Sequence, residues 1–201
     1  MLSATAIVSS HDRYTSLWHE QEPAAPATGL DDFERIVAEQ HRANFELWHA
    51  EDDARSPHAD DHEVARIKRV IDRINQQRND LMEQCDLLLM AHLSARGLPD
   101  PAAALHSETP GLMIDRLSIL ALKLFHTGEE IGRANAPEGH AQRNRERYAI
   151  LEEQRSNLAG CLDRLWSEIL AGERRIQLYL QLKMYNDPAL NPVQYKRLPE
   201  R

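Results

Sequence analysis

The feature that most constrains the fold of this chain is an uninterrupted run of helix-forming residues from Asp60 to Arg96, which meets no proline or glycine before Gly97. Within this run apolar residues recur at steps of three and four, the spacing of one face of a long packed helix. The apolar positions are Val64, Ile67, Ile71, Ile74, Leu81, Cys85 and Leu88. We therefore expect a long helix that other helices cover on one side.

One position in this series is polar, because Arg78 stands where an apolar residue is due. Three more polar residues lie within two turns of it on the same side of the predicted helix: Asp72, Asn75 and Asn79. A charged side chain is rarely buried without a partner. The helix therefore either contains a structural polar layer or contributes to a site.

Composition supports an all-helical protein. Hydrophobic residues make up 42% of the chain and aromatic residues only 5%, which is more typical of helical bundles than of β-sandwiches. The formal charge of -8 disfavours nucleic acid as a partner. Cys85 and Cys161 both fall in helical patterns and form no CxxC pair, so we interpret them as small core residues.

Targeting signals are not evident in the sequence. The N-terminal segment has neither a basic leader nor the apolar core of a signal peptide. No run of the chain approaches the roughly 18 apolar residues of a membrane span. We therefore expect no membrane span and a cytoplasmic location.

Four amphipathic segments predict an all-α fold, an antiparallel bundle of four long helices with extended N- and C-terminal arms. The predicted helices run from Asp31 or Asp32 to about Arg55, from 60 to 96, from Pro110 to about Gly128, and from about Pro137 to Tyr185. The predicted organisation is an N-terminal arm with a Pro/Ala linker at 1–29, the helical bundle domain at 30–185 and a Pro-rich tail at 186–201.

A short echo in the sequence joins tryptophan to histidine twice, as Trp18-His19 and Trp48-His49. The echo is either a coincidence or a pair of amphipathic rings that flank one pocket, since tryptophan is common at ligand sites. Both interpretations stay open from the sequence.

Acidic residues suggest a magnesium site. Carboxylates three or four residues apart share a helical face, and two such faces opposed can hold Mg²⁺, which then binds a diphosphate. The candidate ligands are Glu51, Asp52, Asp80 and Glu83. The alternative is a solvated acidic face. The Glu-x-x-His spacing of di-iron bundles is absent, because His126 and Glu129 run in the reverse order.

A mixed-charge centre is the second candidate site. Arginine beside carboxylates and amides can bind a phosphate or carboxylate in a bidentate way, whereas the same residues can also form a buried ion-pair layer that fixes which helices are neighbours. The candidate ligand-binding residues are Trp48, His49, Glu51, Arg55, Lys68, Asp72, Asn75, Arg78, Asn79, Asp115 and Arg116. The chain has no GxGxxG, P-loop, GxSxG or HExxH motif, so no catalytic residue is assigned.

Four blocks of sequence carry a family resemblance: ELWHAEDDAR, IKRVIDRINQQRNDLME, ETPGLMIDRLSILALKLFH and KMYNDPALNP. They resemble the bacterial family called domain of unknown function 4254, from about residue 7 to 195. The resemblance implies a cytoplasmic helical protein associated with genes for cell-surface glycan assembly. The matching polar positions are Trp48, His49, Glu51, Asp52, Arg55, Lys68, Arg69, Asp72, Asn75, Arg78, Asn79, Asp80, Glu108, Asp115 and Arg116.

Two functions follow as alternatives. In the first, an interhelical pocket binds or acts on an anionic phosphorylated small molecule, a sugar phosphate or sugar nucleotide, with Mg²⁺ as a candidate cofactor. In the second, the chain is a non-catalytic interaction or scaffold module that binds a protein of glycan synthesis or forms a homodimer, and its buried charges are structural. Whether the protein is an enzyme is left undecided by the sequence.

Overall fold

The computed structural model describes residues 2–21, 29–180 and 189–190, and this part of the chain is all-helical. Its helices are α1 (Ala4–Glu20), α2 (Asp32–Asp53), α3 (Asp61–Ser94), α4 (Pro110–Gly132) and α5 (His140–Leu170). Two short strands, β1 (Ala104–Leu105) and β2 (Arg174–Arg175), pair in parallel. The all-α class predicted from the sequence is confirmed.

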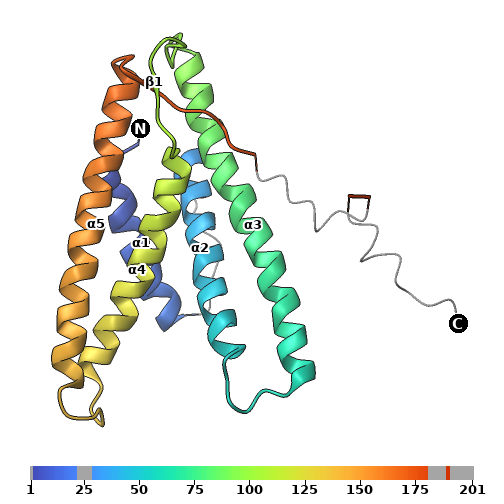
Figure 1. Cartoon of the computed structure of the whole chain (residues 1–201), viewed down its shortest axis with the longest axis vertical. Coiled ribbons are helices and arrows are strands. Elements are labelled where there is room, and N and C mark those ends of the chain that lie inside the picture. Colours follow the sequence, from blue (N-terminus) through green and yellow to red (C-terminus); the bar gives the residue numbers. More distant parts are fainter. Residues whose placement is uncertain (1, 22–28, 181–188, 191–201) are drawn as a thin grey trace, which may run out of the picture.

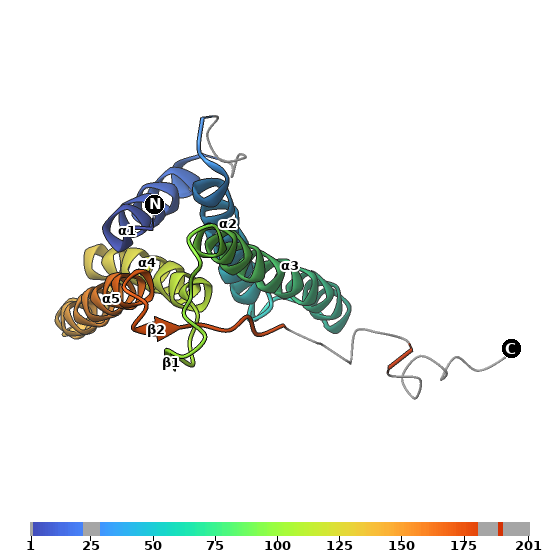
Figure 2. The same cartoon turned by 90° about the horizontal axis from the view of Figure 1, so that it is seen from above.

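The helices form two antiparallel hairpins, and a fifth helix packs against both (Figure 1). Helix α2 packs along α3, and α4 packs along α5. Helix α1 contacts α4, α2 and α5, and the end-on view shows it on one side of the junction between the two hairpins (Figure 2). Because α1, α2 and α4 meet at this junction, side chains from three helices can converge there.

The N-terminal segment differs from its prediction as an extended arm. Residues 4–20 form α1, whose start is capped by the Ser3 hydroxyl accepting a hydrogen bond from the Ala6 amide at 3.4 Å. Ile7, Tyr14 and Trp18 of α1 are buried. The four-helix bundle of the prediction therefore becomes an arrangement of five helices.

The last helix also ends earlier than predicted, at Leu170 rather than near Tyr185. Gly172 follows it with a φ of +75°, a left-handed conformation that glycine adopts without strain and that commonly ends helices. The chain then continues as β2, and Ile176, the residue after this strand, is buried in the core. The tail predicted for 186–201 lies outside the described residues apart from 189–190, and the domain boundaries stay a prediction.

Helix α4 is the central element of the fold, because it contacts each of the other four helices. Its residues Ile114 and Leu117 are fully buried and pack among leucines and isoleucines of the other helices. Leu122, 1% exposed, packs instead with a smaller cluster that contains aromatic residues of α1 and α2. Thr109 caps α4 and Pro110 occupies its first turn. No helix in the described part of the chain is long and apolar enough to cross a membrane.

Helices α3 and α4 approach each other closely at Gly111. A Cβ atom at Gly111 would lie 2.7 Å from the Met82 carbonyl oxygen and 2.8 Å from Cγ of Asp86. The Asp86 carboxylate also accepts a hydrogen bond from the Gly111 amide at 2.7 Å. The absence of a side chain at Gly111 therefore allows Asp86 to bind the first turn of α4.

We expect Gly111→Ala to lower the free energy of unfolding by about 1–3 kcal/mol, because the methyl group must push two backbones apart in a packed core. Urea denaturation of purified protein measures the change. The matched control is Gly160→Ala in α5, where a Cβ meets nothing within 4 Å. This control should raise stability by up to about 1 kcal/mol through helix propensity alone. Equal effects of the two substitutions would contradict the proposed contact.

Candidate metal centre

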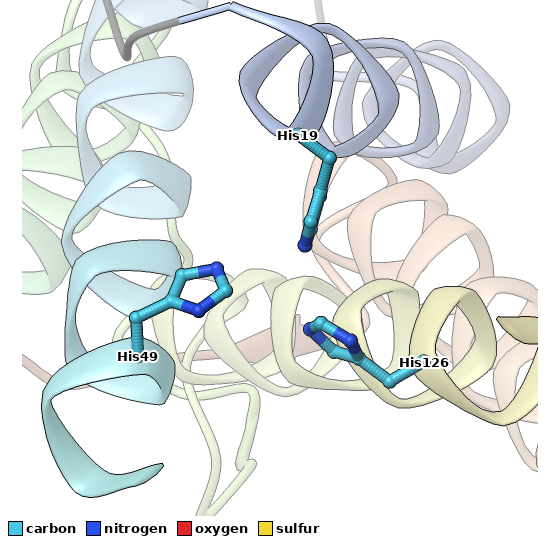
Figure 3. Close-up of side chains that lie close together, drawn as sticks. All are labelled: His19, His49 and His126. Atoms are coloured by element: carbon cyan, nitrogen blue, oxygen red, sulfur yellow. The ribbon is translucent and has the colours of Figure 1, made fainter. Parts of the chain in front are cut away.

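Three histidines from three helices converge at the junction of α1, α2 and α4. His19 lies at the end of α1, His49 near the end of α2 and His126 in α4, and their rings point toward one another (Figure 3). The ligand nitrogen atoms of all three lie within 4.8 Å of one another. Among the residues that the structure describes, this is the one group of three or more His, Cys, Asp or Glu side chains that meets this criterion.

Two of these rings are oriented by hydrogen bonds that leave the second nitrogen free. Nδ1 of His19 lies 2.7 Å from the carbonyl oxygen of Thr15, and Nδ1 of His126 lies 2.8 Å from a carboxylate oxygen of Glu129. Each Nδ1–H can therefore donate to its oxygen, which leaves a lone pair on Nε2. Metal-binding histidines are commonly held by oxygen acceptors in this way.

The free nitrogens are also buried. Nε2 of His19 and Nε2 of His126 have no hydrogen-bond partner in the described part of the chain. A buried polar atom without a partner costs about 1–3 kcal/mol, so such atoms are rare unless a ligand satisfies them. Two such nitrogens facing the same histidine indicate a place for a ligand with positive charge.

Aromatic side chains enclose the histidines. Phe125 stacks on His19 with ring centroids 4.0 Å apart, and Trp48 stacks on His126 at 4.8 Å with an interplanar angle of 10°. Phe45 meets the rings of His19 and His49 edge-on. These contacts restrict the rotation of the imidazoles and exclude water from their faces.

The environment of His49 favours the neutral imidazole. Burial lowers its pKa, and the neighbouring His19 and His126 lower it further, whereas Asp52 and Asp53 act in the opposite direction. Neutral imidazole is the form that binds a metal ion. His49 therefore remains available as a ligand to lower pH than an isolated histidine.

Of the mixed-charge centre predicted from the sequence, the structure brings one ion pair together in the core, Arg78 with Asp115. Asp115, only 4% exposed, accepts a hydrogen bond from Nε of Arg78 at 2.7 Å and a second from Nη2 of the same side chain. Its carboxylate also accepts hydrogen bonds from the side-chain amides of Gln40 and Asn44. Arg78, the charged residue that interrupts the apolar face of α3, therefore has a partner on α4.

A chain of hydrogen bonds connects this layer with α1. Asn44 donates to the Ser118 hydroxyl at 2.9 Å, and Ser118 lies 2.7 Å from Nδ1 of His41. Nε2 of His41 lies 2.9 Å from the Thr15 hydroxyl. Thr15 is the residue whose carbonyl oxygen orients His19. Burial lowers the pKa of His41 to about 3, so this ring is neutral.

The remaining site residues predicted from sequence lie apart from this layer. Glu51 pairs with Arg55 at 2.8 Å, Lys68 pairs with Asp72, and Arg116 pairs with Glu108 at 2.8 Å. Asn75 and Asn79 are half-buried on α3. No group of metal-ligating side chains among the described residues includes the acidic candidates Glu51, Asp52, Asp80 and Glu83. The structure thus brings Arg78 and Asp115 together but does not gather the acidic set.

Sequence reasoning singled out part of the histidine cluster. The tryptophan-histidine echo contained His19 and His49, whose ring centroids lie 5.3 Å apart. Trp48 of the echo stacks on the cluster, whereas Trp18 is buried against Tyr14 and His41. His126 was not a site candidate, and its one signal is the carboxylate of Glu129 three residues later.

The fold and site together define an all-α protein with a candidate histidine metal centre. The chain belongs to the family described as "Protein of unknown function (DUF4254)", which matches residues 34–178. The family resemblance found in the sequence is therefore confirmed. His49 and His126 lie within the matched region, whereas His19 precedes it. No curated protein and no solved structure matches the chain.

Proposed function

We propose that this protein binds a divalent transition metal, zinc in the first place, through His19, His49 and His126. The observation that carries the proposal is the pair of buried Nε2 atoms on His19 and His126, which face His49 and have no hydrogen-bond partner among the residues described. Imidazole ligands suit zinc, whereas magnesium prefers oxygen. The histidine cluster therefore favours zinc over the magnesium considered from the acidic residues.

The geometry needs only a modest adjustment to accept zinc. Zn–N bonds of 2.0–2.1 Å in a tetrahedral site place two ligand nitrogens about 3.3 Å apart. The nitrogens here lie within 4.8 Å of one another, and His49 is half-buried. Rotation of His49, whose ring contacts are edge-on rather than stacked, can close this difference.

The proposed activity is hydrolysis of an anionic phosphorylated metabolite, a sugar phosphate or sugar nucleotide of cell-surface glycan metabolism. Three protein ligands leave the fourth position of a zinc ion for water, whose pKa the ion lowers to about 7. Hydrolysis would break the P–O ester bond: the water oxygen would bond to phosphorus, and one proton of the water would go to the departing ester oxygen. The choice of substrate follows from the glycan association that the family resemblance implies.

The second candidate is a non-catalytic interaction or scaffold module with structural charges. The pairing of Arg78 with Asp115 inside the core favours a structural role for that layer. The charged layer can be structural whether or not the histidines bind a metal ion. Measurement of metal binding therefore tests the first function separately from the second.

The test is the zinc stoichiometry and affinity of purified protein, measured by elemental analysis and calorimetry. We expect one zinc per chain, and we expect His19→Ala, His49→Ala and His126→Ala each to weaken binding at least about 100-fold, since loss of a ligand exceeds the 10–100-fold cost of losing an outer partner. Replacement by Co²⁺ should give the visible bands of a four-coordinate ion.

The matched control for this test is His62→Ala, which removes an exposed histidine in the first turn of α3. This variant should bind zinc like the unchanged protein. Zinc binding that is unaffected by all three cluster substitutions, or that depends equally on His62, would rule out the proposed centre.

A further inference from the structure

A cavity of about 440 Å³ adjoins the histidine cluster and shares His126 with it. Trp48 and His126, which stack on each other, form part of its wall, and α4 and α5 supply the rest. Its volume falls within the range of about 300–1,000 Å³ that small-molecule sites occupy. A molecule in this cavity would therefore lie beside the ring of a proposed metal ligand.

Two cations line this cavity. Lys123 of α4 and Arg147 of α5 are exposed, and in the part of the chain that the structure describes neither forms an ion pair. Nη1 of Arg147 donates to the amide oxygen of Asn144 at 3.2 Å, which orients the guanidinium without neutralising it.

The one carboxylate in the lining already has partners. Glu130 lies 3.3 Å from Arg133 and 2.7 Å from His140, both outside the lining. It is therefore partly neutralised by its own neighbours. The cavity consequently presents positive charge beside an apolar indole ring.

We propose that this cavity is the substrate subsite of the metal centre and that it holds a phosphate monoester. Lys123 would contact the phosphate as a point charge, and the planar guanidinium of Arg147 would bind two of its oxygens. Trp48 would contact the organic part of the molecule, since an indole offers a large apolar surface. This inference rests on the proposed function, because His126 would place the phosphate near the metal.

A dianionic phosphate explains the site better than a carboxylate does. Two cations that have no acidic partner among the described residues line the cavity, whereas a singly charged carboxylate needs one bidentate arginine. Gln154 adds an amide group to the same lining and can donate to a phosphate oxygen, whereas the side-chain amide of Asn144 already donates to His140. The positive charge of the lining therefore matches a phosphate monoester.

The experiment compares phosphorylated and unphosphorylated probes by calorimetry on the full chain, with and without zinc. The probes are uridine 5′-monophosphate with uridine, and glucose 1-phosphate with glucose. We expect at least one phosphorylated probe to bind 10-fold or more tightly than its unphosphorylated counterpart. The stronger probe shows whether the phosphate comes from a nucleotide or a sugar.

Substitutions locate the subsite. Lys123→Ala and Arg147→Ala should each weaken binding of the phosphorylated probe about 10-fold, as expected for the loss of one charged contact, while leaving one zinc per chain. Arg145→Ala is the matched control, because it removes an exposed arginine from the same helix and outside the cavity. This control should leave the affinity unchanged.

The outcomes separate the two proposals. Normal zinc binding with no phosphate-dependent binding, or with binding unaffected by Lys123 and Arg147, overturns the subsite and leaves the metal centre intact. Failure to bind zinc together with phosphate binding that depends on both cations overturns the metal centre and leaves the cavity as a phosphate site only. Circular dichroism confirms that each exposed-residue variant is folded.

Discussion

Asp115→Ala is expected to lower the free energy of unfolding by roughly 3 kcal/mol, the cost of breaking a buried ion pair. The substitution leaves the Arg78 guanidinium, whose side chain is 21% exposed, without its carboxylate. It also leaves the amides of Gln40 and Asn44 without their shared acceptor. The predicted loss is thus mainly the desolvation cost of donors that have lost their partner.

Asp72→Ala is the matched control for this prediction. Asp72 pairs with Lys68 at four residues' separation on the surface of α3, and both side chains are more than half exposed. Surface pairs of this kind contribute about 0.2–0.5 kcal/mol. Urea denaturation should therefore separate the two aspartates clearly. An equally small effect for Asp115 would show that the buried layer does not stabilise the fold.

The contrast between these aspartates shows what helical periodicity can predict. Arg78 was identified because it interrupts an apolar seam, and the structure gives it a buried partner. Asp72 was grouped with it because both were placed on one side of α3, but it points to solvent. A 3.6-residue period fixes the direction of a side chain only within a broad sector, so residues at the edge of a stripe can face either way.

Helix α1 was missed because its inner face is not uniformly apolar. Two of its buried residues, His11 and Thr15, are polar and engage His41 through ring stacking at 4.4 Å and a hydrogen bond. These polar residues interrupt the apolar face formed by Ile7, Tyr14 and Trp18, so the helical pattern is weaker in the sequence. Their burial depends on partners in α2, which a reading of α1 alone does not contain.

The sequence predicts too late an end for α5, because apolar residues continue at helical spacing beyond it. Ile176 and Tyr179 extend the apolar spacing of the preceding helix, and they favoured continuation beyond Gly172. In the structure Ile176 is buried, but it follows the strand β2 and is not part of a helix. Burial of an apolar residue does not require a helix, and here the left-handed glycine decides the conformation.

The histidine centre could be only partly predicted, since its members come from three helices. His19 and His49 share a local sequence context, so the echo between them was visible. His126 has no such context, and its place in the cluster depends on how α4 packs between α1 and α2. Convergence of distant segments is a property of the tertiary packing, which the spacing within one helix does not report.

Zinc is expected to raise the stability of the protein by about 4 kcal/mol when it is present at a thousandfold excess over its dissociation constant. This gain should become smaller as the pH falls from 7.5 to 5.5. Each ligand must be neutral to bind, so protons compete with the metal ion at every imidazole.

The pH experiment requires the difference between zinc-loaded and zinc-free protein, because the zinc-free protein also loses stability in acid. Burial lowers the pKa of both His11 and His41 in the folded state, to about 3 for His41. The unfolded chain consequently binds more protons below about pH 6.5, and stability falls as the pH decreases through this range. Thermal unfolding with and without zinc at each pH isolates the stabilisation that zinc binding contributes. A zinc-induced shift in melting temperature that stays constant from pH 7.5 to 5.5 would exclude imidazoles as the metal ligands.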